Sequence, residues 1–178
     1  MTSLCKSKVI AFDVSVEALE YESSRHHVIL WLGVLVNHGD NRVLDTQSSS
    51  DVLQGYDLPA GQSRSMLERF AGSGWSMSVV GSNSAVWTAG VIGRLLGPGL
   101  RFGPGDQVRL TIDNERRQLR VSVNGRPEVV AVRRLWRASS QSPQQQQPIV
   151  HAIAHLSDIQ HPQVAKRARA VLRVGDFL

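Results

Sequence analysis

Residues 105–132 alternate apolar and polar side chains with the period of a β-strand, and this pattern constrains the fold more than any other feature. Two sets of three apolar residues are each separated by single polar residues: Val108, Leu110 and Ile112, then Leu119, Val121 and Val123. Each set would place its apolar side chains on one face of a strand. Asn124-Gly125 follows, and this dipeptide suits the positive φ angles of a two-residue hairpin turn. With a return through residues 128–132, the segment predicts a three-stranded antiparallel meander.

Further segments have the patterns of strands. In residues 8–16, Asp13 and Ser15 alternate with apolar residues and are therefore expected to face the opposite side. Residues 28–36 form an uninterrupted apolar run followed by turn residues, which is typical of a strand buried on both faces. The last two candidates are residues 149–156 and 168–174. About eight to ten short strands with turns between them predict an all-β fold, an antiparallel β-sandwich.

The chain has the size and composition of one domain with long insertions. It contains 178 residues, of which 42% are hydrophobic, enough for a real core. We expect a single domain over residues 1–178, with a long loop at residues 44–65 and a glutamine-rich loop insertion at residues 137–148. The best helix candidate is short, at residues 63–71.

Membrane insertion and secretion are not expected. The longest apolar run has nine residues, about half the length that a membrane span requires. Cys5 is the one cysteine, so no intramolecular disulfide can form, and the N-terminus lacks the apolar block of a signal peptide. We therefore expect an intracellular protein, cytoplasmic or nuclear, with an organelle matrix left open.

Charge is unevenly distributed along this basic chain. Residues 1–89 carry six Lys and Arg against nine Asp and Glu, whereas residues 90–178 carry 14 against six. All but three of the 20 basic residues are arginine, which forms bidentate pairs with carboxylates and phosphates. Two interpretations stay open: a contact surface for RNA or acidic protein, and an ordinary solvated face.

The motifs contain little enzyme chemistry. The glycine-rich residues 97–105 match no phosphate-loop spacing, and Pro98 and Pro104 remove amide donors, so a turn before a strand is the better interpretation. His151 and His155 would lie about 13 Å apart on a strand, too far to hold one metal ion. No nucleophile motif or paired carboxylates occur, and we expect neither an enzyme nor a cofactor.

Four tryptophans are the notable aromatic residues. Trp31 lies within the apolar run and is expected in the core, whereas Trp75 and Trp87 lie on short strands or their flanks. Trp136 follows Arg134 and precedes Arg137. It is either an exposed interface residue or a side chain that closes one end of the sandwich.

The order of these features resembles the SPRY domain family. Gly105-Asp106 opens an alternating strand that ends in Asp113, and a second strand ends in Asn124-Gly125. Residues 148–153 are similar to the family's later Pro-x-Val strand, residues 170–174 take the place of its closing strand, and residues 31–34 are similar to its early Gly-Val strand. The resemblance implies a concanavalin A-like jelly roll that recognises proteins.

The resemblance implies a non-catalytic module whose edge loops bind a short peptide or a partner surface, as an adaptor or a subunit of a larger assembly. Rigid strands suit that task because the scaffold has already ordered the loops. The candidate loops are residues 37–61, 90–105 and 133–147. The candidate contact residues are Arg42, Asp45, Tyr56, Arg101 and Trp136.

Two other functions are weighed. The basic second half predicts an RNA-associated subunit of a ribonucleoprotein, with strongly salt-dependent binding. A carbohydrate-binding lectin is the weaker alternative, since only the shared sandwich architecture supports it.

Overall fold

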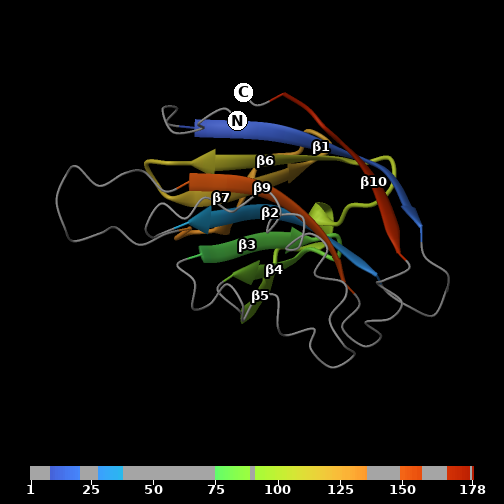
Figure 1. Ribbon diagram of the computed structural model, residues 1–178, viewed down its shortest axis with the longest axis horizontal. Coiled ribbons are helices and arrows are strands. Elements are labelled where there is room, and N and C mark those ends of the chain that lie inside the picture. The colour runs from blue at the N-terminus through green and yellow to red at the C-terminus, as the bar shows by residue number, and fades with distance from the viewer. Residues whose placement is uncertain are drawn as a thin grey trace.

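The computed structural model describes residues 9–20, 28–37, 75–88, 91–135, 149–157, 168–176 and 178, and these residues form two five-stranded antiparallel sheets (Figure 1). Sheet A contains, in spatial order, β10 (Arg169–Val174), β1 (Val9–Glu20), β6 (Gln107–Asp113), β7 (Gln118–Val123) and β8 (Val129–Val132). Sheet B contains β5 (Val91–Leu95), β4 (Ala85–Thr88), β3 (Trp75–Gly81), β2 (Ile29–Asn37) and β9 (Ile149–Ser157). A short 3₁₀ turn, η2 (Pro98–Leu100), precedes β6.

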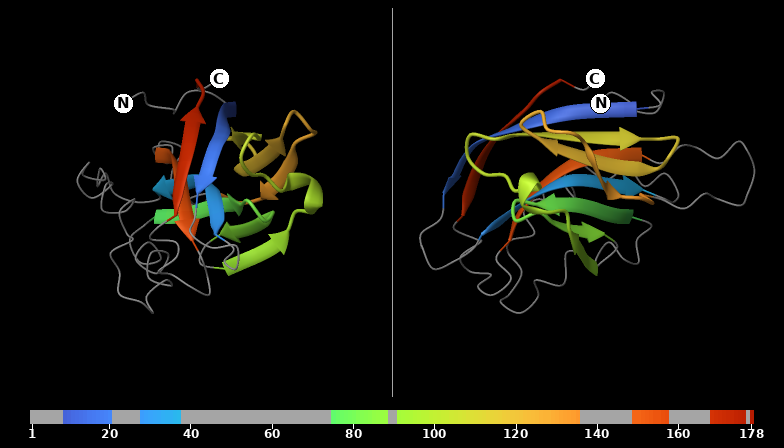
Figure 2. Two further views of the ribbon diagram at one scale, coloured as in Figure 1. Left: turned by 90° about the vertical axis from the view of Figure 1, so that its right-hand side faces the viewer. Right: turned by 180° about the vertical axis from the view of Figure 1, so that it is seen from behind.

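The two sheets form the two layers of a sandwich and share one core (Figure 2). Sheet A contributes alternate residues of β1, β6 and β7, such as Phe12, Leu110 and Val121. Sheet B contributes alternate residues of β2, such as Leu32 and Val34. Burial of these side chains is the main stabilising term, about 1.5–3 kcal/mol for each large one. The predicted all-β antiparallel sandwich is therefore confirmed.

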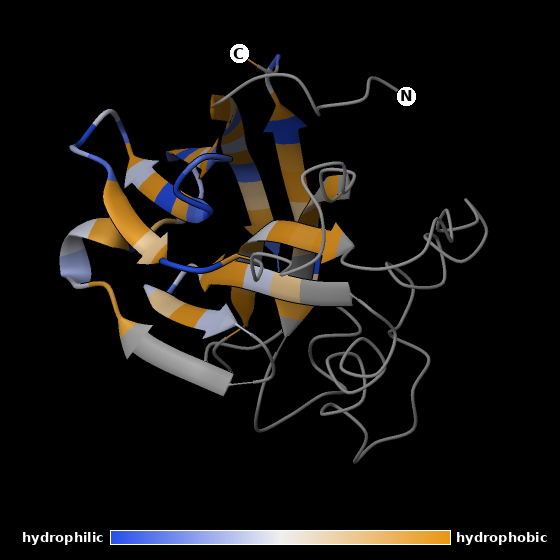
Figure 3. Cartoon of the chain, turned by 90° about the vertical axis from the view of Figure 1, so that its left-hand side faces the viewer, coloured by the Kyte–Doolittle hydropathy of each residue, from blue (hydrophilic) through white to orange (hydrophobic). Residues whose placement is uncertain are grey.

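The meander and its turn are confirmed in detail. β6, β7 and β8 are neighbours in sheet A, and the alternate apolar residues of β6 and β7 belong to the core together with Ala131 and Val132 of β8. Figure 3 shows the alternation as hydrophobic and hydrophilic bands along the strands. Asn124 and Gly125 have φ angles of 53° and 71°, and the Arg126 N–H donates to the Val123 carbonyl at 3.1 Å. These are the two positive φ angles that the Asn-Gly dipeptide predicted.

β2 is buried on both faces, as its apolar run predicted. Leu30 and Leu32 face the core between the sheets, whereas Trp31 and Leu35 belong to a second apolar cluster on the other face of sheet B. Trp31 is fully buried and meets Trp87 of β4 edge to face, with ring centroids 6.0 Å apart. The prediction that Trp31 is a core residue is confirmed.

Two boundaries differ from the sequence prediction. The segment 90–105 was predicted as a loop, but its residues 91–95 form β5, so the loop begins only at residue 96. β5 is a five-residue edge strand containing Gly93, too short and irregular to show alternation. β1 continues four residues past the predicted end at Val16, because a bulge near Glu17 lets the chain go on pairing with β10.

Other predictions fall on parts of the chain that are not described. The loop at residues 44–65, the helix at residues 63–71 and the glutamine-rich insertion at residues 137–148 lie outside the described residues. Within the described ranges, no helix is long and apolar enough to cross a membrane.

Candidate functional site

One end of the sandwich is built from connections that the structure describes completely. Residues 96–106 join β5 to β6, residues 124–128 join β7 to β8, and residues 82–84 join β3 to β4 at this end, on the right of Figure 1. Two buried side chains, Leu100 and Phe102, anchor the first connection in the core. The Phe102 N–H also donates to the Ser82 carbonyl at 3.2 Å. The connection is therefore fixed to both sheets.

Asp106 and Asn124 join two of these connections. The Asn124 side-chain amide donates to one Asp106 carboxylate oxygen at 2.7 Å, and the other oxygen accepts the Gly103 N–H at 2.8 Å. Asn124 Oδ1 in turn accepts the Gln107 N–H at 2.9 Å. The Gly-Asp and Asn-Gly elements that carry the family resemblance thus contact each other in space. We call residues 96–106 and 124–126 the loop platform.

The loop platform holds its backbone in place and leaves its charged side chains at the surface. Arg101 is exposed, while its N–H donates to the Pro98 carbonyl at 3.2 Å. Arg126 is also exposed, and its guanidinium donates to the Gly99 carbonyl at 3.0 Å across the platform. Such a surface presents two exposed arginine side chains on an ordered backbone, and arginine suits the carboxylates or carbonyls of a partner.

Of the five contact residues proposed from the sequence, Arg101 alone falls on the described residues. Arg42, Asp45, Tyr56 and Trp136 lie outside them. The described residues from which the candidate loops start do not all lie at one end of the sandwich. Asn37, which leads into the first loop, pairs with Trp75 and Ile149 at the end opposite the loop platform. The chain after β8 reaches that opposite end too, where the Leu135 N–H donates to the Arg117 carbonyl at 2.8 Å.

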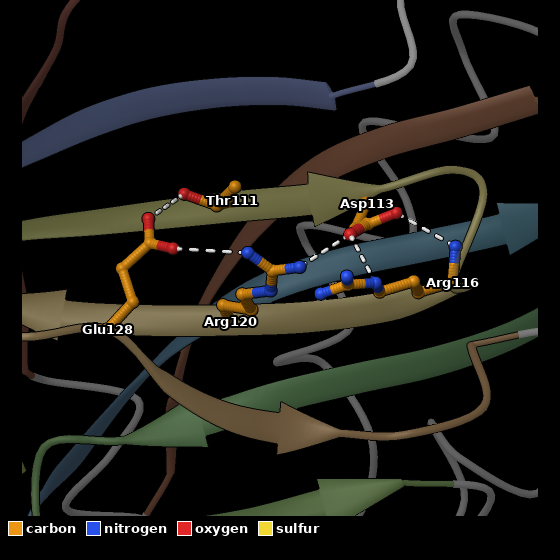
Figure 4. Close-up of polar contacts among 5 residues, drawn as sticks. All are labelled: Thr111, Asp113, Arg116, Arg120 and Glu128. Carbon is orange, nitrogen blue, oxygen red and sulfur yellow. Dashed lines mark hydrogen bonds and ion pairs between the residues drawn. The ribbon is translucent and has the colours of Figure 1, made fainter.

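A polar network on the outer face of sheet A was not predicted from the sequence (Figure 4). Asp113 is buried, accepts a hydrogen bond from Arg120 at 2.5 Å and accepts the Arg116 N–H at 2.8 Å. Arg120 also lies 3.7 Å from Glu128, which accepts the Thr111 hydroxyl at 2.5 Å. The signal that would have found it is the cross-strand pairing of Thr111 with Arg120, which places both on the outer face.

The network links two strands to the chain before β8. Asp113 binds Arg120 and the Arg116 N–H, whereas Glu128 accepts the Thr111 hydroxyl and lies 3.7 Å from Arg120. Among the described residues, no group of three or more His, Cys, Asp or Glu side chains could hold a metal ion. We assign the network to the cohesion of β6, β7 and the chain before β8.

Ion pairs cross the strands on the same outer face. Arg109 of β6 lies directly opposite Asp13 of β1 and donates two hydrogen bonds of 2.8 Å to its carboxylate. These hydrogen bonds hold the pKa of the Asp13 carboxyl below its usual range, against a smaller opposing effect of partial burial. As predicted from the alternation in β1, Asp13 faces away from the core.

The ion pair between Asp13 and Arg109 predicts that the free energy of unfolding depends on pH in the acidic range. Because the folded-state pKa of Asp13 is lowered, its contribution is present above the unfolded value of about 3.9 and is lost as pH falls through the folded value. Asp13→Asn should therefore be less stable than the parent protein at pH 6, and the difference should shrink below about pH 4. Urea unfolding at pH 6, 4 and 3 measures it. Arg109→Gln should show the same pH dependence. A stability difference between parent and variant that stays constant down to pH 3 would contradict the role of this ion pair.

Several arginines lie at the end of the sandwich opposite the loop platform. The contact between Leu135 and Arg117 brings the β6–β7 turn beside the residues after β8. Arg116, Arg133 and Arg134 are exposed there, and Arg117 is partly exposed. We call these four residues the arginine end. Exposed Glu115 is the acidic residue next to them in the β6–β7 turn.

Comparisons with known proteins return no match: no protein-family model, no curated protein and no solved structure is similar to this chain at a significant level.

Proposed function

We propose that the protein is a non-catalytic recognition module that binds a peptide or partner surface through the loop platform, as an adaptor or a subunit of a larger assembly. The observation that carries the proposal is the bond between Asp106 and Asn124, which joins the two connections while Arg101 and Arg126 stay exposed. The resemblance to the SPRY family, which recognises proteins through edge loops, supports the same function.

Preorganisation is the physical reason that this surface suits recognition. Ordering a loop on binding costs free energy, about 0.5–1.5 kcal/mol for each immobilised side chain. Residues 96–106 are already held by Leu100, Phe102 and the Asp106 carboxylate. A partner therefore meets a backbone that is already ordered. Its binding free energy is not reduced by the cost of ordering this loop.

The test is to purify the tagged protein from its native cells, identify co-purifying proteins with and without nuclease, and repeat this with variants. Arg101→Ala should weaken capture of the principal partner about tenfold or more, because exposed arginines often dominate interfaces. Arg116→Ala is the matched control. It removes another exposed arginine at the opposite end and should leave capture within about twofold. Equal capture by the parent protein and Arg101→Ala would contradict a platform centred on Arg101.

The arginine end favours a second candidate function, that of an RNA-associated subunit. Four arginines from two separate segments gather there, as a phosphate-binding surface requires. In this case the partners would vanish after nuclease treatment. Affinity for labelled single-stranded RNA would fall steeply with salt, and Arg133→Ala would make that dependence shallower. RNA binding that is absent or insensitive to salt excludes this candidate.

A further inference from the structure

Among the described strands, β10 (Arg169–Val174) lies at one edge of sheet A. Within the described part of the chain it pairs with β1 alone. Just after β10, the Gly175 N–H donates to the Asp13 carbonyl at 2.8 Å. Because successive residues of a strand direct their N–H groups to opposite sides, the amides of Leu172 and Val174 point away from β1. These N–H groups lie at the outer edge of β10, where carbonyl groups of another strand could accept hydrogen bonds from them.

The side chains of β10 form two different rows beside this edge. On the inner face, Ala170 and Leu172 pack partly buried against the core, and Val174 is 53% exposed. On the outer face, Arg169 and Arg173 are exposed cations. Arg173 keeps 76% of its side-chain surface exposed while it binds Glu17 at 2.7 Å. An added strand would therefore meet apolar groups on the inner face and two arginines on either side of Val171 on the outer face, with Glu17 and Glu20 of β1 beyond them.

The other edge of sheet A is less suited to pairing. β8 has four residues, follows closely after Pro127 and is itself followed by Arg133 and Arg134. Short strands, proline and flanking charges are the devices that keep an edge unpaired. β10 has six residues and contains no proline or glycine.

Charge decides which kind of strand would pair with β10. A second copy would bring four arginines together on one short ribbon, and like charges facing each other across strands are destabilising. Two copies of a chain with net charge +5 also repel each other. Acidic side chains opposite Arg169 and Arg173 would instead form favourable cross-strand pairs, with apolar side chains extending the core.

We propose that β10 is a docking edge for an extended acidic segment of a partner protein, in which acidic and apolar residues alternate and which adds to sheet A as a further strand. Main-chain hydrogen bonds would supply affinity and the two rows of side chains would supply specificity, as in other strand additions. This surface is distinct from the loop platform and does not depend on the function proposed for it.

The experiment measures binding of a fluorescent peptide with glutamate and valine alternating over about six residues, by anisotropy with the full chain. We expect saturable binding at micromolar concentrations, as for a small interface. Val174→Pro should weaken it about tenfold, because it removes an outward N–H and leaves the bonds to β1 in place. The comparison variant Val174→Ala also removes the valine side chain but keeps that N–H, so it should weaken binding clearly less than Val174→Pro does. Urea unfolding checks that both variants fold.

A charge exchange and a scrambled peptide complete the test. Arg169→Glu should weaken binding of the glutamate peptide and improve binding of the same peptide with lysine in place of glutamate. Three results would overturn the proposal: no binding at about 1 mM peptide, equal effects of Val174→Pro and Val174→Ala, or equal binding of a peptide with its glutamates and valines in separate blocks. A dimer that Val174→Pro abolishes and that the peptide does not compete with would also overturn it, in favour of a second copy.

Discussion

Gly33→Ala should destabilise the protein by about 3 kcal/mol, since there is no space for a side chain at this position. A Cβ placed on Gly33 would lie 2.1 Å from the Ser78 carbonyl oxygen and 2.6 Å from Val79 Cα. Both are backbone atoms of β3, which pairs with β2 at this point. The two central strands of sheet B would have to separate, with loss of hydrogen bonds. Urea unfolding with a two-state fit measures the change.

Gly103→Ala is the matched control for this prediction. A Cβ on Gly103 would meet no atom within 4 Å, and the N–H that donates to Asp106 is kept. Stability should be unchanged or higher by up to about 1 kcal/mol, because alanine reduces the entropy of the unfolded chain. Similar losses in the two variants would show that contact with β3 is not the cause.

Asp113→Ala should have the second-largest effect, a loss of about 3 kcal/mol. Asp113 is 5% exposed, and its removal leaves Arg120 without its closest carboxylate and the Arg116 N–H without its acceptor. Removing one partner of a buried ion pair costs more than the pair contributes, because the other charge stays behind. Denaturant unfolding at neutral pH is the measurement.

Two further variants separate the parts of this effect. Asp113→Asn keeps an acceptor for the Arg116 N–H but loses the charge, so its cost should be intermediate, about 1–2 kcal/mol. Arg116→Ala removes a side chain that is 71% exposed and 3.9 Å from Asp113, and should cost less than about 0.5 kcal/mol. If Arg116→Ala destabilises the protein as much as Asp113→Ala does, Arg120 is not the main partner of Asp113.

The elements with strict alternation or an uninterrupted apolar run could be predicted from the sequence. β6 and β7 alternate over their whole length because one face meets the apolar core and the other carries polar side chains, some exposed and some buried in the polar network around Arg120. β2 is apolar throughout because both its faces are buried. The hairpin turn could also be predicted, because Asn124-Gly125 suits the two positive φ angles that the turn requires.

Features that depend on pairing between distant segments could not be predicted. β5 lies at an edge and needs no alternating pattern, so the sequence predicts a loop over these five residues. The pair between Asp13 and Arg109 and the bond between Asp106 and Asn124 follow from strand register, which a single sequence does not give. Likewise, the sequence does not show that Asn37 and Leu135, at the starts of two candidate loops, lie at the end of the sandwich opposite Arg101.

The strand order also has a kinetic consequence. β1 is an inner strand of sheet A and lies between β6 and β10, so it pairs only with strands that are made much later. During synthesis the apolar face of β1 can pack against β2, but its backbone has no strand partner in sheet A until β6 leaves the ribosome, and its other edge waits for β10. Such high contact order predicts slow folding, on the order of milliseconds to seconds. In that interval the nascent chain depends on chaperones more than a meander of neighbouring strands would.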